Sequence, residues 1–372
     1  MKFKIAVLGA TGYIGSPYRK EIRACKDDAT IVSLCARRLN NLEAAAKEDG
    51  AEFFSDDWQK VITHPGVNLV LVCTPDAIHQ KAVMACAAQG VSVLCEKPVG
   101  VNAKEAWQMW NVYRSSKLGH FVPFWTRYVG IFRRTREVVQ AGALGEIRAF
   151  TYRWYNPRPA SMPFTWRDDG EVSAGGSIGD VGSHVYDTLR WILEDEAQRV
   201  LVHADIITPP KPDLGNIDLR EALYWGGQHK SSEAKQIRKG TAYDYASIAV
   251  QMRSGILGTI VLSHAAFLRK GIAPELELHG TDASLSLDRI TGALRVFRRG
   301  AKPETVATLP DKGLGNRFSQ YVFPALRERI AGGHSEHPGL DDGYRVQIFT
   351  DSAACAARRG AWVDLSEIEN QR

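Results

Sequence analysis

The first 124 residues alternate short apolar runs with segments of helical pattern, and this alternation allows few folds. Runs rich in valine, isoleucine and leucine indicate strands, and the segments between them carry helical periodicity. Strands alternating with helices are typical of a doubly wound parallel sheet, which is an α/β fold. Six strands are expected, at 4–8, 30–35, 52–55, 68–73, a run from 91 that ends at Lys97, and 120–124.

The pattern changes after about residue 124. One helical segment, 131–141, is followed by strand-like runs at 147–155, 200–207, 246–252, 258–263 and 276–278. Strands segregated after a βα half are typical of an α+β domain with a largely antiparallel sheet. At 372 residues the chain is also too long for one ordinary core. We therefore expect one domain over residues 1–124 and a second, α+β domain over residues 125–372.

The interval 209–240 fits neither pattern. It contains prolines, lysines and glycines around Trp225-Gly226-Gly227, with little periodicity. Long loops inside compact domains are commonly functional lids or disordered segments. The sequence predicts a long loop here and leaves its role open.

Composition narrows the class of protein. The net charge is +5, with 47 basic residues scattered among 42 acidic ones, which argues against nucleic-acid or membrane partners. The six cysteines show no CxxC and no framework spacing, so reduced core thiols are expected. The apolar run near the N-terminus is too short for a signal peptide, and no stretch approaches membrane-spanning length. A cytoplasmic protein without a metal site is the expectation.

A glycine-rich turn follows the first expected strand. Its residues are Gly9, Ala10, Thr11, Gly12, Tyr13, Ile14 and Gly15, in GxxGxxG rather than GxGxxG spacing. Glycines let the backbone turn tightly and approach a pyrophosphate, which then rests on the N-terminus of the next helix. Such turns also occur without a ligand, but the position between a strand and a helix favours dinucleotide binding.

The end of the second strand bears on the type of dinucleotide. Enzymes that use NAD commonly place Asp or Glu there, to bind the adenosine ribose. This chain has Cys35-Ala36-Arg37-Arg38 and no acid until Glu43. Two guanidinium groups suit a 2′-phosphate, although they are also compatible with solvated loop charges. The sequence favours NADP, with NAD as the alternative.

Cys95-Glu96-Lys97-Pro98 closes the fifth apolar run. A charged pair followed by proline cannot continue a central strand. It delivers a lysine to the carboxyl edge of the sheet, where open parallel sheets bind ligands.

A second group of polar residues lies in the glycine-rich segment 175–187. If a helix begins near Ser177, Asp180 and His184 lie at i and i+4 on one face, and Asp187 follows a turn later. A carboxylate beside an imidazole raises its basicity, which suits a general base. Alternatives are a metal site, for which two aligned ligands are few, and a buried histidine satisfied by Asp180. The surrounding glycines favour a ligand site.

These motifs together resemble the glucose-fructose oxidoreductase and inositol dehydrogenase (Gfo/Idh/MocA) family. The resemblance is carried by the glycine turn, Thr74-Pro75 with His79, Glu96-Lys97-Pro98 and the Asp180/His184 segment. Further matches are Arg127, 144–147, Trp166-Arg167, Thr241 with Asp244, and 278–281. The resemblance implies an N-terminal Rossmann dinucleotide-binding domain, and then an α+β domain with a large, mostly antiparallel open sheet that supports a homodimer or homotetramer.

The resemblance also implies roles for individual residues. Lys97, Asp180 and His184 form the implied catalytic trio. The implied cofactor-binding residues are Gly9 to Gly15, Ala36, Arg37, Arg38, Cys73, Thr74, Pro75, His79, Glu96, Lys97, Pro98, Trp166 and Arg167. The substrate-binding candidates are Lys97, Arg127, Tyr155, Arg158, Asp180 and His184.

The expected function is an NAD(P)-dependent oxidoreductase. It would transfer a hydride between the nicotinamide and a secondary alcohol or ketone of a sugar, glycoside or cyclitol. His184 can take the hydroxyl proton and Lys97 can bind the oxygen, although the sequence does not decide which of the two is the base. One alternative is a glycoside hydrolase or lyase that oxidises its substrate transiently with bound NAD. A non-catalytic binding protein is a third class, and the presence of both Lys97 and His184 argues against it.

Overall fold

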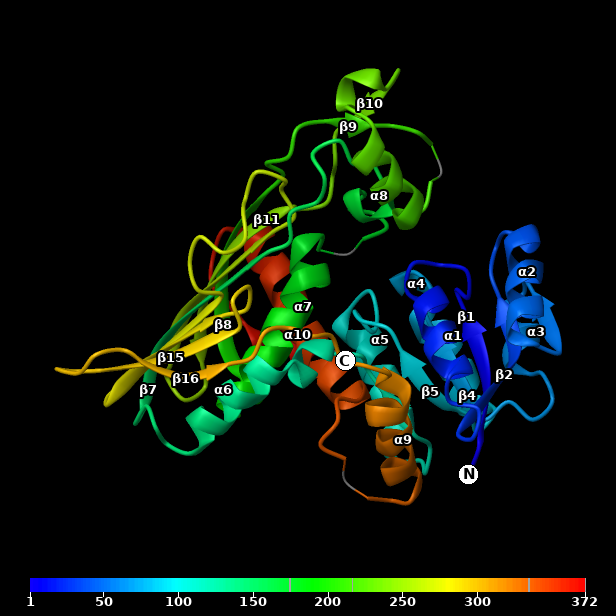
Figure 1. Ribbon diagram of the computed structural model, residues 1–372, viewed down its shortest axis with the longest axis horizontal. Helices are drawn as coiled ribbons and strands as arrows, with labels where there is room; N and C mark the ends of the chain where they lie inside the picture. Colours follow the sequence, from blue (N-terminus) through cyan, green and yellow to red (C-terminus); the bar gives the residue numbers. More distant parts are fainter. Residues whose placement is uncertain (174, 216, 334, 372) are drawn as a thin grey trace. The chain divides into compact units, whose positions relative to one another are not determined.

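The computed structural model describes residues 1–173, 175–215, 217–333 and 335–371, and the chain divides into two compact units. The first unit comprises Met1–Pro123 and Gly315–Gln347, and the second comprises Phe124–Leu314 and Ile348–Arg372. Each unit is built on its own large sheet (Figure 1).

The first unit holds a six-stranded sheet in the order β3-β2-β1-β4-β5-β6, and every neighbouring pair is parallel. This is the strand order of the Rossmann fold, so the predicted fold class is confirmed. The central strands β4 and β5 are buried throughout, as expected of a parallel sheet covered on both faces. The strands are β1 Phe3–Leu8, β2 Ala29–Cys35, β3 Phe53–Ser55, β4 Leu69–Val72, β5 Ser92–Cys95 and β6 His120–Phe121.

The helices of the first unit follow its strands much as the sequence predicts. They are α1 Gly15–Arg23, α2 Leu39–Asp49, α3 Trp58–Ile62, α4 Asp76–Ala88 and α5 Ala103–Arg114. The third helix is capped by Asp57, whose carboxylate accepts from the Gln59 amide. The first helix begins at Gly15, and Gly12 belongs to the preceding turn, where its amide donates to the Gly9 carbonyl.

Residues 315–347 pack with the first sheet, whereas the sequence placed them in the second domain. This segment includes α9, Phe323–Ile330, and the start of α10, Leu340–Arg359. Phe323 stacks on Phe3 with ring centroids 5.0 Å apart, and Arg317 forms an ion pair with Glu21 of α1. These contacts join parts of the sequence about 300 residues apart, which local patterns do not reveal.

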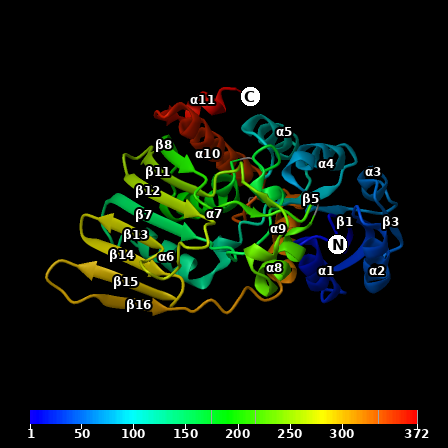
Figure 2. The same ribbon diagram turned by 90° about the horizontal axis from the view of Figure 1, so that it is seen from above.

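The second unit holds a nine-stranded sheet in the order β16-β15-β14-β13-β7-β12-β11-β8-β17 (Figure 2). Only the β12–β7 pair is parallel, so the predicted mostly antiparallel sheet is confirmed. The strands that the sequence predicted are β7 Ile147–Tyr155, β8 Ala197–Asp205, β11 Tyr245–Met252, β12 Leu257–Ser263 and β13 Leu276–Gly280. Those it missed are β14 Ala283–Asp288, β15 Ala293–Arg298, β16 Glu304–Thr308 and the short β17 Val363–Asp364.

Helices cover one face of this sheet. Figures 1 and 2 show α6, Gly130–Gln140, and α7, Ser177–Leu193, against that face, where α7 contacts β7, β11 and β12. Along β11 every second residue is buried, because alternate side chains point to the helices. The chain ends in α11, Leu365–Glu369.

The interval 209–240 is not the irregular loop that the sequence predicted. It contains α8, Leu219–Gln228, and a two-stranded sheet formed by β9, Lys211–Pro212, and β10, Ile237–Arg238. A capping box starts α8, since Asp218 accepts from the Glu221 amide and Glu221 accepts from the Asp218 amide. The serine/aspartate-to-glutamate spacing of this box was the available signal, but the glycine pair at 226–227 obscured the helix that follows it.

Candidate active site

In the glycine turn of the first unit, Gly9 and Gly15 pack closely against backbone atoms, whereas Gly12 is less crowded. A Cβ on Gly9, whose φ is +75°, would lie 2.4 Å from the Cys73 carbonyl oxygen, and one on Gly15 would lie 2.3 Å from the Gly9 carbonyl oxygen. Both glycines are therefore required by close backbone packing. A Cβ on Gly12 would meet only the Gly9 carbonyl oxygen, at 3.2 Å. Gly12 is the position where a ligand can approach the backbone.

The start of α1 carries a helix dipole that suits a pyrophosphate, while the Ser16 amide already donates to the Gly12 carbonyl and Pro17 has no N–H. Ile14 caps the helix without a side-chain hydrogen bond, and the first turn carries no acidic residue. The first amides of a helix and its dipole favour an anion at this point. At the adjacent end of β4, the Thr74 hydroxyl is buried and makes no hydrogen bond within the described residues. The dipole at this helix start and an unpartnered hydroxyl at the same sheet edge fit a bound dinucleotide.

His79 lies behind this edge. Its ring nitrogens lie 2.8 Å from the Thr74 carbonyl oxygen and 2.9 Å from the Pro98 carbonyl oxygen, and the residue is fully buried. The imidazole therefore ties the turn after β4 to the turn after β5. These contacts position the two turns, and the cofactor contact that the resemblance implies for His79 stays a prediction.

Lys97 follows β5 at the carboxyl edge of the sheet, as the sequence predicted. The preceding Glu96 is buried and accepts a 2.5 Å hydrogen bond from the Tyr18 hydroxyl of α1. Its second oxygen lies 3.3 Å from the Lys97 amide nitrogen. Burial raises the pKa of Glu96 above its ordinary value, and the bond from Tyr18 opposes the rise. Lys97 itself is partly exposed, whereas the carboxylate of Glu96 is buried.

The end of β2 carries the arginines that the sequence singled out. Ala36 is buried, whereas Arg37 and Arg38 are exposed, and Arg38 stands at the start of α2. The first acidic residue after β2 is the exposed Glu43 within α2. This part of the edge thus offers guanidinium groups, where many Rossmann proteins place a carboxylate for the ribose.

In the second unit, Asp180 belongs to a group of charged side chains at the start of α7. Its Oδ2 lies 2.8 Å from Arg167 Nη1, 3.5 Å from Arg158 Nη2 and 3.4 Å from His264 Nε2. Arg167 in turn stacks over Trp166, 4.7 Å from the ring centroid. Of these distances from Asp180, the one to Arg167 is the shortest, and the expected role of Asp180 in catalysis stays a prediction.

Asp168 and Lys211 complete this group, and the sequence analysis missed both. Lys211 Nζ lies 2.6 Å from Asp168 Oδ1, and Asp168 Oδ2 accepts from the Thr165 amide and hydroxyl. Burial alone would raise the pKa of Asp168, but Lys211 and Arg158 outweigh it and lower the pKa. Lys211 belongs to the interval that the sequence treated as a loop, so no local pattern marked it.

His184 lies one turn after Asp180 on α7 and rests on aromatic rings. Its imidazole stacks on Trp154 of β7, with centroids 5.9 Å apart and planes 19° apart, and meets Phe124 edge-on at 6.2 Å. The guanidinium of Arg289 lies over Trp154, 4.6 Å from its ring centroid. Tyr155, a predicted substrate contact, follows Trp154 at the end of β7 and is partly exposed.

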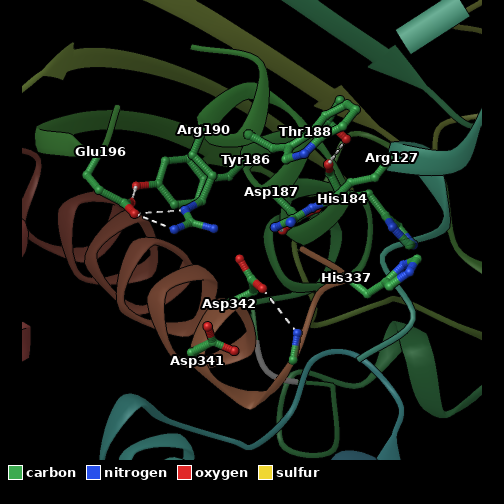
Figure 3. Close-up of polar contacts among 12 residues, drawn as sticks. Arg127, His184, Tyr186, Asp187, Thr188, Arg190, Glu196, His337, Asp341 and Asp342 are labelled. Carbon is green, nitrogen blue, oxygen red and sulfur yellow. Dashed lines mark hydrogen bonds and ion pairs between the residues drawn. The ribbon is translucent and has the colours of Figure 1, made fainter. Parts of the chain in front are cut away.

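Arg127 forms a buried ion pair with Asp187. It bonds to both oxygens of Asp187 on α7, with Nε 2.8 Å from Oδ2, and both side chains are almost entirely buried (Figure 3). Further along α7, Tyr186 and Arg190 meet Glu196 at 2.7 and 2.9 Å. These contacts fix α7 in the second unit. The predicted role of Arg127 in substrate binding stays a prediction.

The predicted catalytic trio is divided between the units, with Lys97 in the first and Asp180 and His184 in the second. The six cysteines, all of them described, form no disulfide. Among the described residues, no three or more His, Cys, Asp or Glu side chains gather in a way that could hold a metal ion. No described helix is long and apolar enough to cross a membrane.

A six-stranded Rossmann sheet with this glycine turn, followed by a large mixed sheet, defines a dinucleotide-binding oxidoreductase class. Residues 3–123 match the model of an oxidoreductase family with an NAD-binding Rossmann fold, and residues 132–286 match the GFO/IDH/MocA C-terminal domain. The chain belongs to the GFO/IDH/MocA family of oxidoreductases.

Characterised relatives match most of the chain at low identity. Levoglucosan dehydrogenase of Pseudarthrobacter phenanthrenivorans is 24% identical over an alignment of 349 residues, and the match covers 87% of this chain and 86% of the relative. Myo-inositol 2-dehydrogenase of Thermotoga maritima is 24% identical over 320 residues, 86% of this chain and 81% of the relative.

Solved structures share the fold. A levoglucosan dehydrogenase in complex with NADH and L-sorbose has a TM-score of 0.81 at 20% identity, covering 99% of this chain and 100% of that one. An oxidoreductase domain protein from Kribbella flavida has a TM-score of 0.82 at 22% identity, covering 98% and 99%.

Proposed function

We propose that the protein is an NAD(P)-dependent dehydrogenase that acts on a secondary alcohol of a sugar, glycoside or cyclitol. The single observation that carries the proposal is Lys97, which a buried strand delivers to the edge of a Rossmann sheet within an NAD-binding oxidoreductase family. The relatives named for levoglucosan and myo-inositol support a polyhydroxylated substrate.

The proposed roles follow from the chemistry of each side chain. A bound nicotinamide supplies the hydride acceptor, for which Gly9 to Gly15, Cys73 to Pro75 and Glu96 to Pro98 are the proposed binding segments. Lys97 donates a hydrogen bond to the substrate oxygen and stabilises the charge that develops there. His184 accepts the hydroxyl proton. Arg167 pairs with Asp180 at 2.8 Å and thereby fixes the position of this carboxylate beside the substrate.

We further propose a preference for NADP over NAD. Two exposed guanidinium groups, Arg37 and Arg38, follow β2, and the position usual for a ribose-binding carboxylate holds none. Bidentate bonds from arginine recognise phosphate groups well. Equilibrium titration of NADPH and NADH into the wild type and Arg37→Ala tests this. Tighter NADPH binding that weakens in the variant is expected, and equal binding of both nucleotides by both proteins contradicts the preference.

A panel of alcohols tests the activity. Levoglucosan, myo-inositol and methyl D-glucosides are incubated with the purified protein and each nucleotide, and reduced cofactor is followed at 340 nm, the usual wavelength for this chromophore. Formation of reduced cofactor with at least one alcohol, and its loss in Lys97→Ala, is the expected result. Turnover that survives Lys97→Ala contradicts the mechanism. Sugar release from a glycoside without net reduction of the cofactor would instead support a redox-assisted glycoside hydrolase.

A cytoplasmic homodimer or homotetramer is also proposed. Along β11 and β7 alternate residues point away from the covering helices and are only partly buried within one chain, which leaves a sheet face available to a second copy. Light scattering after size-exclusion chromatography gives the mass directly, and a monomer at micromolar concentration contradicts the proposal.

A further inference from the structure

His264 follows β12 directly, and the sequence analysis assigned it no role. Its side chain is 6% exposed, and its Nε2 faces Asp180 Oδ2 at 3.4 Å. This buried nitrogen makes no hydrogen bond within the described residues. Buried polar atoms in native proteins are nearly always hydrogen-bonded, so an exception at the edge of a candidate site points to a missing ligand atom.

Arg158 lies beside His264, because its amide donates to the His264 carbonyl at 3.2 Å. Its guanidinium nitrogens lie 3.5 Å from Asp180 and 3.6 Å from Asp168, beyond the usual length of an N–H···O bond. Each of these aspartates has a closer cation, Arg167 or Lys211. The donors of Arg158 are thus held between two carboxylates without a short bond to either.

The charges around this pair balance, which bears on the kind of ligand. Three cations, Arg158, Arg167 and Lys211, face three carboxylates, Asp168, Asp180 and Asp244. A carboxylate ligand would add a negative charge next to Asp180 and Asp168. A hydroxyl adds none, and its oxygen can accept from Arg158 while the same group pairs with His264 in either tautomer.

We propose that Arg158 and His264 together bind a second hydroxyl of the substrate, distinct from the one that is oxidised. The inference rests on the proposed oxidation of a polyhydroxylated alcohol. Burial, and then Arg158, lower the pKa of His264 to about 3, so this imidazole is too weak a base to take a proton at neutral pH. Its partner is therefore a hydroxyl that keeps its proton, and the pair sets specificity and orientation.

Three substitutions of His264 separate this role from a structural one. His264→Gln keeps a polar atom near the position of Nε2, His264→Asn falls short of it, and His264→Leu removes it. His203→Leu is the matched control, because His203 is exposed on β8 of the same sheet. Because a buried nitrogen without a partner disfavours folding, His264→Leu is expected to unfold at the same temperature as the wild type or a higher one.

Calorimetric titration of the panel alcohols, with nucleotide present, measures the effect. We expect His264→Leu and His264→Asn to weaken binding about 10- to 100-fold, while His264→Gln and His203→Leu stay within about threefold of the wild type. If His264→Leu does not fold, the contrast between Asn and Gln decides. Equal binding by all variants overturns the inference, and so does a wild type that binds no alcohol of the panel.

Two further outcomes are distinguishable. A wild type that binds an alcohol without reducing nucleotide contradicts the proposed function, and the variants' dissociation constants still decide the role of His264. Tighter binding of D-glucuronate than of the uncharged sugars, lost in Arg158→Gln, would make the pair a carboxylate site and overturn the hydroxyl assignment.

Discussion

Tyr18 on α1 donates a 2.5 Å hydrogen bond to Glu96 at the end of β5. The helix that follows the glycine turn is thereby tied to the residue that precedes Lys97. Arg317 stacks over the Tyr18 ring at 4.7 Å and pairs with Glu21, so the segment 315–347 supports the same contact from its other side. The cofactor turn and the proposed catalytic lysine consequently share one buried anchor.

Tyr18→Phe removes the hydroxyl that donates to Glu96 and should lower the stability of the folded protein. The buried Glu96 carboxyl loses its donor, and the free energy of unfolding should fall by about 1–3 kcal/mol. The loss should be larger at pH 8 than at pH 5, because the bond to an ionised carboxylate is the stronger one. Urea unfolding at both pH values measures it.

The matched control is Tyr13→Phe, since Tyr13 is exposed in the same part of the chain. It should leave the free energy of unfolding unchanged. An equal loss in both variants, or a loss in Tyr18→Phe that does not depend on pH, would show that the Tyr18–Glu96 bond is not the cause.

Glu275 in the second unit gives a separate dependence of stability on pH. Burial raises its pKa from 4.5 to about 7, although Arg289, 3.8 Å away, opposes the rise. Because the folded state favours the protonated form of Glu275, this residue adds to the free energy of unfolding at low pH. Its contribution is complete below pH 4.5 and is lost as the pH rises through 7. The shift corresponds to on the order of 3 kcal/mol, at about 1.36 kcal/mol per pKa unit.

Glu275→Gln should remove this contribution to the slope of unfolding free energy between pH 5 and pH 8. Urea titrations across that range provide the slope. Glu277→Gln, two residues after Glu275, is the control for replacing a carboxylate by an amide. A slope identical in the wild type and in Glu275→Gln would show that Glu275 titrates at the same pH in the folded and unfolded chain.

Local patterns in the sequence were sufficient for the first sheet and for the position of the motifs. Buried parallel strands are continuous apolar runs, so the Rossmann order and the start of α7 at Ser177 could be predicted. The strands β14 to β16, which end at one edge of the sheet, were missed because one face of each is polar and their runs are short. The packing of 315–347 depends on contacts distant in sequence, such as Phe323 on Phe3.

The candidate site likewise contains residues that local motifs reveal and residues that only the fold brings together. Lys97, Asp180 and His184 lie in recognisable motifs and could be singled out from the sequence, and their catalytic roles stay a prediction. Lys211 and His264 were not, because single residues from separate elements meet Asp168 and Asp180 only through the fold. The sequence also could not show that His79 bonds to two carbonyl oxygens. A histidine that joins two turns and a histidine that contacts a cofactor would look the same in this motif.

The Arg127–Asp187 pair permits a test of whether Arg127 binds substrate. Arg127→Met leaves the fully buried Asp187 uncompensated and should cost about 3–5 kcal/mol of unfolding free energy. Arg127→Met combined with Asp187→Leu removes both charges and should recover most of that loss. Chemical denaturation of the single and double variants measures both effects.

Kinetics of the double variant then separate the two roles. A KM close to that of the wild type would assign Arg127 to the support of α7. A large rise in KM, with stability restored, would support the substrate contact that the sequence predicted.

Gly9 and Gly12 of the turn should respond differently to alanine. The methyl group of Gly12→Ala meets only the Gly9 carbonyl oxygen, so the free energy of unfolding should change by less than about 1 kcal/mol. NADH binding should weaken at least about tenfold, because the same methyl group enters the space that the ligand would occupy. Gly9→Ala should lose stability by more than the about 1–2 kcal/mol that its positive φ alone costs, because its Cβ also meets the Cys73 carbonyl.

Gly50→Ala provides the control for that comparison. Gly50 ends α2 with φ +66° and has nothing within 4 Å of an added Cβ, so its variant measures the cost of the positive φ without a clash. Fluorescence titration with NADH and urea unfolding of all three variants give the two quantities separately. If Gly12→Ala binds NADH as tightly as the wild type, the pyrophosphate does not pass over Gly12, and the turn serves only to pack β1 against β4 and α1.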